Sequence, residues 1–153
     1  MALRVVLVEP LIPQNTGSIA RLTAATCIPL HLIEPLGFEL TDRYLKRAGL
    51  DYWSEVILTC HPTWEDFLEK TGVVSRDLNF FSKYGEQSYS KVQYNENSVL
   101  VFGNEEKGLS EVFHKKYHAN MVKIPMENER VRSLNLATSV GIGVYEARRQ
   151  IGL

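Results

Sequence analysis

Apolar residues along this chain occur in short continuous runs that alternate with stretches of helical spacing. Residues 3–8 (LRVVLV) form such a run, ended by Glu9-Pro10, which is typical of a strand buried in a parallel sheet. The same pattern predicts further strands at 30–33, 55–59, 78–82, 98–102 and 121–124. Helical spacing and capping residues predict helices at 16–27, 41–48, 62–70, 110–118 and 134–151. The alternation predicts an α/β fold: a parallel sheet with helices on both faces.

The chain has the size and composition of one globular domain, covering residues 1–153. Its hydrophobic share of 44% and charged share of 23% are ordinary, and no apolar run approaches the ~20 residues that cross a membrane. The N-terminus reads as a strand rather than a signal peptide. Cys27 and Cys60 are too far apart for a zinc motif or a disulfide framework. We therefore expect a cytoplasmic protein that does not bind a membrane.

The net charge of -1, from 17 basic and 18 acidic side chains, argues against a protein that coats nucleic acid by bulk attraction. Any RNA contact must therefore use local clusters of positive charge, each of which taken alone is more often a solvated surface. The candidate clusters are Arg43, Lys46 and Arg47; Arg130 and Arg132; and Arg148 and Arg149.

Gly141 and Gly143 lie inside the long final helix, where each costs about 1 kcal/mol relative to alanine. That cost indicates the close approach of another backbone. Two explanations remain open: a tight turn of buried chain, or the helix of a second subunit.

The loop after the strand at 98–102 has the spacing of a phosphate-binding loop but the wrong charge. Its sequence is GNEEKGLS, with Leu109 where the phosphate-binding lysine belongs. Glu105 and Glu106 would repel phosphates, and the first strand lacks the glycine pattern of nicotinamide or flavin sites. The loop suits a ligand that has no phosphates and is held by backbone groups. S-adenosylmethionine is a ligand of this kind. A plain strand-to-helix turn remains the alternative.

Arg21 and the histidines are the other candidates for chemistry. Arg21 lies near the start of the first predicted helix, at the ligand-binding edge of such sheets, where it can grip a phosphate; a surface arginine is the alternative. His114 and His118 have the spacing of metal ligands, but no third ligand is near in sequence and lysines lie between them. We expect surface histidines there, no metal site, and no functional signal from His31 or His61.

Three sequence blocks together resemble the SPOUT superfamily of RNA methyltransferases, in particular the short tRNA wobble-position ribose methyltransferases. The blocks are N-T-G-x-x-A-R at 15–21, F-G-x-E-x-x-G-L at 102–109, and I-P-M at 124–126 followed by R-S-L-N-L-A at 132–137. Two further stretches, HLIEPLGF at 31–38 and LKRAGLDY at 45–52, are similar to the wobble subgroup itself. The match runs in order over nearly the whole chain.

The resemblance implies features that periodicity does not reveal. The C-terminal part of the chain would thread through an earlier loop as a deep trefoil knot, which is very rare in proteins. The protein would be a homodimer with each active site near the subunit interface. S-adenosylmethionine would lie among three loops, with Asn135 fixing the third. The residues expected to line that cofactor site are Phe81 with its neighbour Ser82, Gly103, Gly108, Ile124, Met126, Ser133 and Leu134.

The implied reaction is methyl transfer to the ribose 2'-hydroxyl of the wobble nucleotide, cytidine or uridine at position 34 of tRNA. Arg21 would orient the acceptor nucleotide, and Tyr145 is a second catalytic candidate, with a packed core tyrosine as the alternative. Arg43, Lys46 and Arg47 would contact tRNA. Two other functions stay open: methylation of another tRNA or rRNA nucleotide, and a non-catalytic RNA-binding dimer of the same fold.

Overall fold

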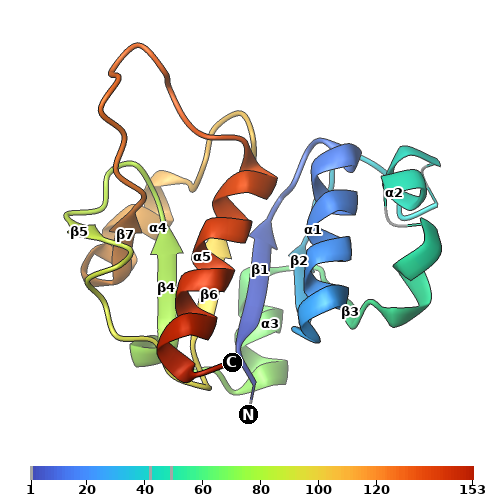
Figure 1. The fold of residues 1–153 in the computed structure, drawn as a ribbon, viewed down its shortest axis with the longest axis horizontal. Coiled ribbons are helices and arrows are strands. Elements are labelled where there is room, and N and C mark those ends of the chain that lie inside the picture. The colour runs from blue at the N-terminus through green and yellow to red at the C-terminus, as the bar shows by residue number, and fades with distance from the viewer. Residues whose placement is uncertain (1, 42, 49) are drawn as a thin grey trace.

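The computed structural model describes residues 2–41, 43–48 and 50–153. Its sheet has seven strands in the order β3-β2-β1-β6-β4-β7-β5, and every pairing of these strands is parallel (Figure 1). The strands are β1 (Arg4–Val8), β2 (Leu30–Ile33), β3 (Leu58–His61), β4 (Leu78–Phe81), β5 (Gln87–Ser88), β6 (Val99–Phe102) and β7 (Met121–Lys123). The helices are α1 (Pro13–Thr26), α2 (Arg43–Ala48), α3 (Trp64–Thr71), α4 (Glu111–Lys116) and α5 (Leu136–Ile151). Short 3₁₀ helices cover Leu50–Glu55, Ser75–Asp77 and His118–Asn120.

Helices cover both faces of the sheet, as the alternating pattern predicts. Along β1, Val5 and Leu7 pack in the core under α1 and α5, whereas Val6 and Val8 pack in the core under α3 and α4. Figure 1 shows α1 and α5 side by side in front of the sheet and α3 behind it. The alternation has one exception, because the chain passes from β4 to β6 through the two-residue strand β5 and no helix.

Several predicted boundaries differ from the structure, and three of these differences have clear local causes. α1 begins at Pro13 instead of Thr16, because proline is favoured in the first helical turn, where its missing N–H costs nothing. The third strand runs from 58 to 61 instead of 55 to 59, because Glu55 ends a 3₁₀ helix. The final helix begins at 136 instead of 134, because the side chain of Asn135 accepts a hydrogen bond from the N–H of Thr138 and caps it.

The two glycines of α5 have different surroundings, and the predicted approach of another backbone within the chain is wrong. A Cβ at Gly143 would lie 2.8 Å from Cζ of Phe81, so an aromatic ring, and not a backbone, excludes a side chain there. At Gly141 the nearest atom outside the helix backbone would be Cδ2 of Leu22, at 4.0 Å. Gly143 therefore makes room for Phe81, which stacks on Phe102 with ring centroids 4.5 Å apart.

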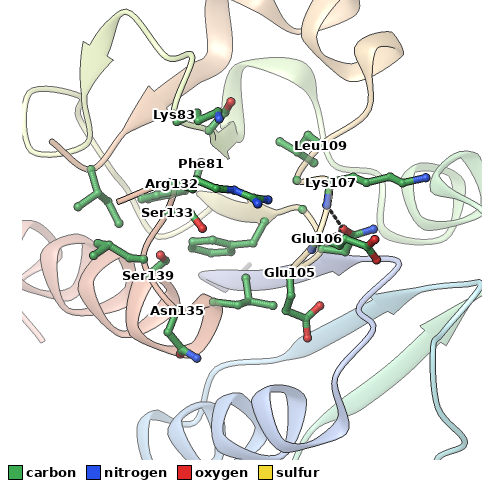
Figure 2. Close-up of a pocket in the computed structure, with 18 of the residues that line it drawn as sticks. Phe81, Lys83, Glu105, Glu106, Lys107, Leu109, Arg132, Ser133, Asn135 and Ser139 are labelled. Carbon is green, nitrogen blue, oxygen red and sulfur yellow. Dashed lines mark hydrogen bonds between the residues drawn. The ribbon is translucent and has the colours of Figure 1, made fainter. Parts of the chain in front are cut away.

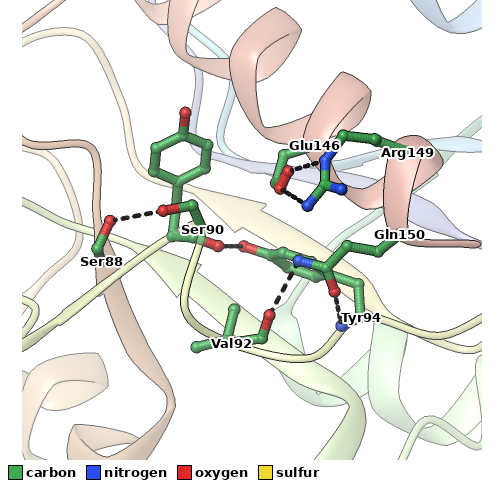
Figure 3. Close-up of polar contacts among 8 residues, drawn as sticks. Ser88, Ser90, Val92, Tyr94, Glu146, Arg149 and Gln150 are labelled. Carbon is green, nitrogen blue, oxygen red and sulfur yellow. Dashed lines mark hydrogen bonds and ion pairs between the residues drawn. The ribbon is translucent and has the colours of Figure 1, made fainter.

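The C-terminal end of α5 is tied to the segment between β5 and β6 (Figure 3). The side-chain carbonyl of Gln150 accepts the N–H of Tyr94 at 2.9 Å, and its amide donates to the carbonyl of Val92 at 3.1 Å. The hydroxyl of Tyr94 donates to the carbonyl of Tyr89 at 2.6 Å, and burial raises the pKa of that hydroxyl. In the described part of the chain, no helix has both the length and the apolar character to cross a membrane.

Candidate functional site

A cavity of about 450 Å³ opens at the carboxyl ends of β4, β6 and β7, beside the start of α5 (Figure 2). Parallel α/β sheets bind ligands at this edge. All the residues that the family resemblance implies for the cofactor site border this one cavity, although they come from three separate parts of the chain. They are Phe81, Ser82, Gly103, Gly108, Ile124, Met126, Ser133 and Leu134.

The loop after β6 folds back on itself as a tight turn. Asn104 and Gly108 exchange backbone hydrogen bonds of 3.3 and 3.1 Å, and the side chain of Asn104 accepts the N–H of Lys107 at 2.7 Å. A Cβ at Gly103 would lie 2.1 Å from the carbonyl carbon of Gly108, so only glycine fits. Gly108 has a φ of 65°, which also favours glycine. Both glycines are therefore required by the shape of the loop that forms one cavity wall.

Glu105 links this loop to the start of α1. Its carboxylate accepts the N–H of Leu11 at 2.9 Å, the N–H of Ile12 at 2.7 Å and the side-chain amide of Asn15 at 3.3 Å. A negative charge is favourable at a helix N-terminus, and Ile12, the N-cap residue of α1, has no polar side chain of its own. The sequence shows the charge of Glu105, but it does not indicate these partners.

Asn135 extends the same network to the third cavity segment. Its side-chain amide donates to Oδ1 of Asn15 at 3.0 Å, while its own Oδ1 caps α5 through Thr138. Glu105, Asn15 and Asn135 thus join the loop after β6, the start of α1 and the start of α5. The role of Asn135 in fixing the third loop, expected from the resemblance, has a direct physical basis in these contacts.

His114 also lines the cavity, although only a surface histidine is expected from the sequence. Its Nδ1 lies 3.0 Å from the carbonyl of Ser110 and its Nε2 lies 2.8 Å from Oγ of Ser82. Because the carbonyl can only accept, Nδ1 carries the proton, and in the neutral ring the Ser82 hydroxyl donates to Nε2. Ser82 and His114 are too far apart in sequence for any local pattern to indicate this contact.

The expected catalytic residues lie outside the cavity lining of their own chain. Arg21 is exposed on α1, with its guanidinium 4.8 Å from the ring centre of Tyr52. Because α1 begins at Pro13, Arg21 lies more than two turns along the helix and not near its start as expected. Tyr145 is 53% exposed on α5 and lies beneath the guanidinium of Arg148, so the alternative of a packed core tyrosine is wrong.

Two of the three side chains expected to contact tRNA are described, and both are exposed. Arg43 and Arg47 lie on α2, which packs against α1. The side chain of Lys46 is outside the described residues.

A buried chain of hydrogen bonds lies away from the cavity, beneath α3. Nδ1 of His31 is 2.9 Å from Nε2 of His61, and Nδ1 of His61 is 3.0 Å from a carboxylate oxygen of Asp66. Burial, followed by the charges of His61 and Arg4, lowers the pKa of His31 to about 4. The hydrogen bond from His61, followed by Lys70, lowers the pKa of Asp66. Among the described residues, no cluster of three or more His, Cys, Asp or Glu side chains is arranged to hold a metal ion.

The chain is similar to proteins of known family over almost its full length. The family described as the SpoU rRNA Methylase family matches residues 2–145. A relative from Saccharophagus degradans, named tRNA (cytidine(34)-2'-O)-methyltransferase, is 43% identical over 151 residues, which are 97% of this chain and 95% of the relative.

Two solved structures share the fold. One, from work on the 2-OH methylation of C/U34 on tRNA, has a TM-score of 0.88 and 46% identity, with 97% of this chain and 95% of that chain covered. The other, an AdoMet-bound rRNA methyltransferase from Sinorhizobium meliloti, has a TM-score of 0.84 and 25% identity, with 97% of this chain and 56% of that chain covered.

Proposed function

Because the chain belongs to the SpoU rRNA methylase family, we propose that it methylates the ribose 2'-hydroxyl of nucleotide 34, cytidine or uridine, in tRNA, with S-adenosylmethionine as the methyl donor. The names of full-length relatives support the acceptor, and an AdoMet-bound relative supports the donor. The observation that carries the proposal is the convergence on one cavity of residues from the ends of β4 and β6 and from the segment after β7.

The cavity fits the proposed donor. Its apolar walls, which include Phe81, Phe102, Ile124 and Leu134, suit an adenine ring, and its tight loops offer backbone hydrogen-bonding groups. The carboxylate of Glu105 is held by Leu11, Ile12 and Asn15, so it braces the loop. When bound, S-adenosylmethionine supplies a methyl group on a positively charged sulfur, which makes that methyl strongly electrophilic.

The remaining task of the protein is to position and activate the acceptor hydroxyl. A ribose hydroxyl holds its proton firmly at neutral pH, so an adjacent positive charge that stabilises the developing oxyanion accelerates its reaction. Arg21 would supply that charge and orient the nucleotide phosphate. It would not act as the base, because a guanidinium keeps its proton at neutral pH and therefore cannot accept another. Tyr145 would assist from α5, and Arg43, Lys46 and Arg47 would contact the tRNA from α2.

The positions of Arg21 and Tyr145 favour a homodimer. Both are exposed on helices that cover the same face of the sheet, and both lie outside the cavity lining of their own chain. In a dimer formed through α1 and α5, these side chains would reach the cavity of the partner subunit. The open surroundings of Gly141 on α5 would leave room for a close contact there.

We also propose that residues 1–153 form one cytoplasmic domain whose C-terminal part passes through the loop between β4 and β6 as a trefoil knot. Two observations support the knot. A Cβ at Gly85, in that loop, would lie 2.5 Å from the carbonyl carbon of Val122 in β7. The other end of the same loop is bonded to Gln150 near the end of α5.

The proposed function predicts a specific defect for Arg21→Ala. The variant should fold, dimerise and bind S-adenosylmethionine with a Kd within about twofold of wild type, whereas kcat for methyl transfer should fall by about 100-fold or more. Calorimetry measures the first quantity and transfer of labelled methyl to tRNA the second. Arg76→Ala, an exposed arginine just before the amino end of β4, is the matched control. Unchanged turnover in Arg21→Ala would remove Arg21 from catalysis, and the absence of cofactor binding by wild type would contradict the function itself.

A further inference from the structure

Tyr84 is an exposed aromatic residue at the border of the cavity. It is 68% exposed, yet it belongs to the cavity lining together with Lys83 and His114. Phe81 and Phe102, which also line the cavity, are buried. The exposed ring therefore lies where a ligand that enters from solvent would meet the protein, and not where the enclosed part of a cofactor would lie.

A chain of hydrogen bonds holds Tyr84 in place. The carbonyl of Ser110 fixes His114, the hydroxyl of Ser82 is bonded to His114 at 2.8 Å, and the N–H of Tyr84 donates to Oγ of Ser82 at 3.2 Å. The rings of Tyr84 and His114 also meet edge to face, with centroids 5.6 Å apart and planes at 79°. The hydrogen bond fixes the backbone at Tyr84 and the contact with His114 restrains the ring, which reduces the conformational entropy lost on binding.

The charge beside Tyr84 matches nucleic acid. The ammonium of Lys83 lies over the Tyr84 ring, 5.2 Å from its centre, so a base would stack on the other face of the ring. An aromatic ring next to a cation is the combination by which proteins hold unstacked bases, since the ring stacks on the base and the cation meets the phosphate.

We propose that Tyr84 is a stacking platform for a nucleobase of the acceptor strand, and that Ser82 and His114 position it. This inference rests on the proposed function, because a single-stranded anticodon loop supplies the unpaired bases. It adds an RNA contact on the β4 side of the cavity, separate from the basic residues of α2. The stacked base is either that of nucleotide 34 or that of an adjacent nucleotide.

The test measures the affinity of an anticodon stem-loop RNA for the intact protein. Tyr84→Ala should raise the Kd for RNA about tenfold, and Tyr84→Phe should stay close to wild type. The slope of log Kd against log salt should be unchanged in Tyr84→Ala, whereas Lys83→Ala should reduce it by about one. Val112→Ala is the control for loss of an exposed apolar side chain, since Val112 is 72% exposed and outside the cavity lining. An unchanged Kd in Tyr84→Ala would overturn the proposal, even if the wild-type protein methylates tRNA normally.

RNAs that each lack one base identify the stacked nucleotide. The effect of Tyr84→Ala should disappear with RNA that lacks the base at nucleotide 34, or with RNA that lacks the base of one neighbour, according to which base the ring contacts. An effect that persists with all of these RNAs would show that Tyr84 does not contact a base. Wild-type protein that binds neither S-adenosylmethionine nor tRNA would instead contradict the proposed function.

Discussion

Glu105 bonds to the backbone of Leu11 and Ile12 at the start of α1, which lie 94 and 93 residues away in the sequence. Its neighbour Glu106 is exposed on the same turn. Replacing Glu105 by Gln keeps the shape but puts an NH₂ group against a backbone N–H. We expect Glu105→Gln to lose about 2 kcal/mol of unfolding free energy and to bind S-adenosylmethionine more weakly, because hydrogen bonds to a charged group are stronger than average.

Glu69→Gln is the matched control, since it makes the same chemical change at an exposed position of α3, outside the cavity lining. Urea unfolding and calorimetry of the two variants in parallel give the comparison. Equal stabilities and equal cofactor affinities would contradict the bracing role of Glu105.

His31 makes stability depend on pH. It is 7% exposed, and its pKa of about 4 in the folded protein lies below the value of about 6.5 in an unfolded chain. At a pH between these two pKa values, His31 is protonated in the unfolded chain but neutral in the folded protein. Lowering the pH therefore favours unfolding. We expect the unfolding free energy to fall by roughly 3 kcal/mol from this residue alone as the pH drops from about 7 to about 4.

His31→Asn separates this contribution from the other titrating groups. Its side-chain amide can still donate to His61, but it does not titrate. Urea unfolding at several pH values should give a shallower loss of stability in the variant between about pH 6.5 and pH 4, although the variant is less stable at neutral pH. An identical slope in both proteins would show that His31 is not the responsible group.

At the scale of the elements, the sequence predicts well what local patterns determine and less well what distant contacts determine. The strand at 30–33 is buried along its whole length, and its continuous apolar run locates it correctly. The predicted start of α1 at Thr16 is wrong, although Pro13 itself is typical of a first helical turn. The carboxylate near that helix start comes from Glu105, and no local pattern around α1 can reveal it.

The two glycines of α5 provide a matched pair for the packing of that helix. Gly143→Ala would force a methyl group against Phe81, which is buried and stacked on Phe102, so we expect a loss of about 1–3 kcal/mol of unfolding free energy. Gly141→Ala has no such neighbour in the chain, so its unfolding free energy should fall less than that of Gly143→Ala. Helix propensity adds up to about 1 kcal/mol, and a close contact in the proposed dimer opposes that gain. Urea unfolding at equal protein concentrations compares them. Equal losses in both variants would contradict this account of the packing.

At the scale of the whole molecule, the sequence predicts the architecture and, through the family resemblance, part of the cavity lining, but not how the cavity is braced. Alternating strands and helices indicate the parallel sheet, and the three sequence blocks indicate which loops meet. The contact between Ser82 and His114, and the exposed position of Tyr84, depend on the relative placement of β4 and α4, which no local pattern contains. The order of β7 between β4 and β5 is likewise a property of the complete fold.

Locating the methyl group that the protein adds to tRNA tests the proposed function most directly. Wild-type protein, S-adenosylmethionine and unmethylated tRNA are incubated together, and nuclease fragments of the product are sequenced by mass spectrometry. If the convergent loops hold the donor beside the wobble nucleotide, the product carries one new methyl group on the ribose of nucleotide 34. A methyl group on a base, a methyl group at another nucleotide, or unmodified tRNA would contradict the account.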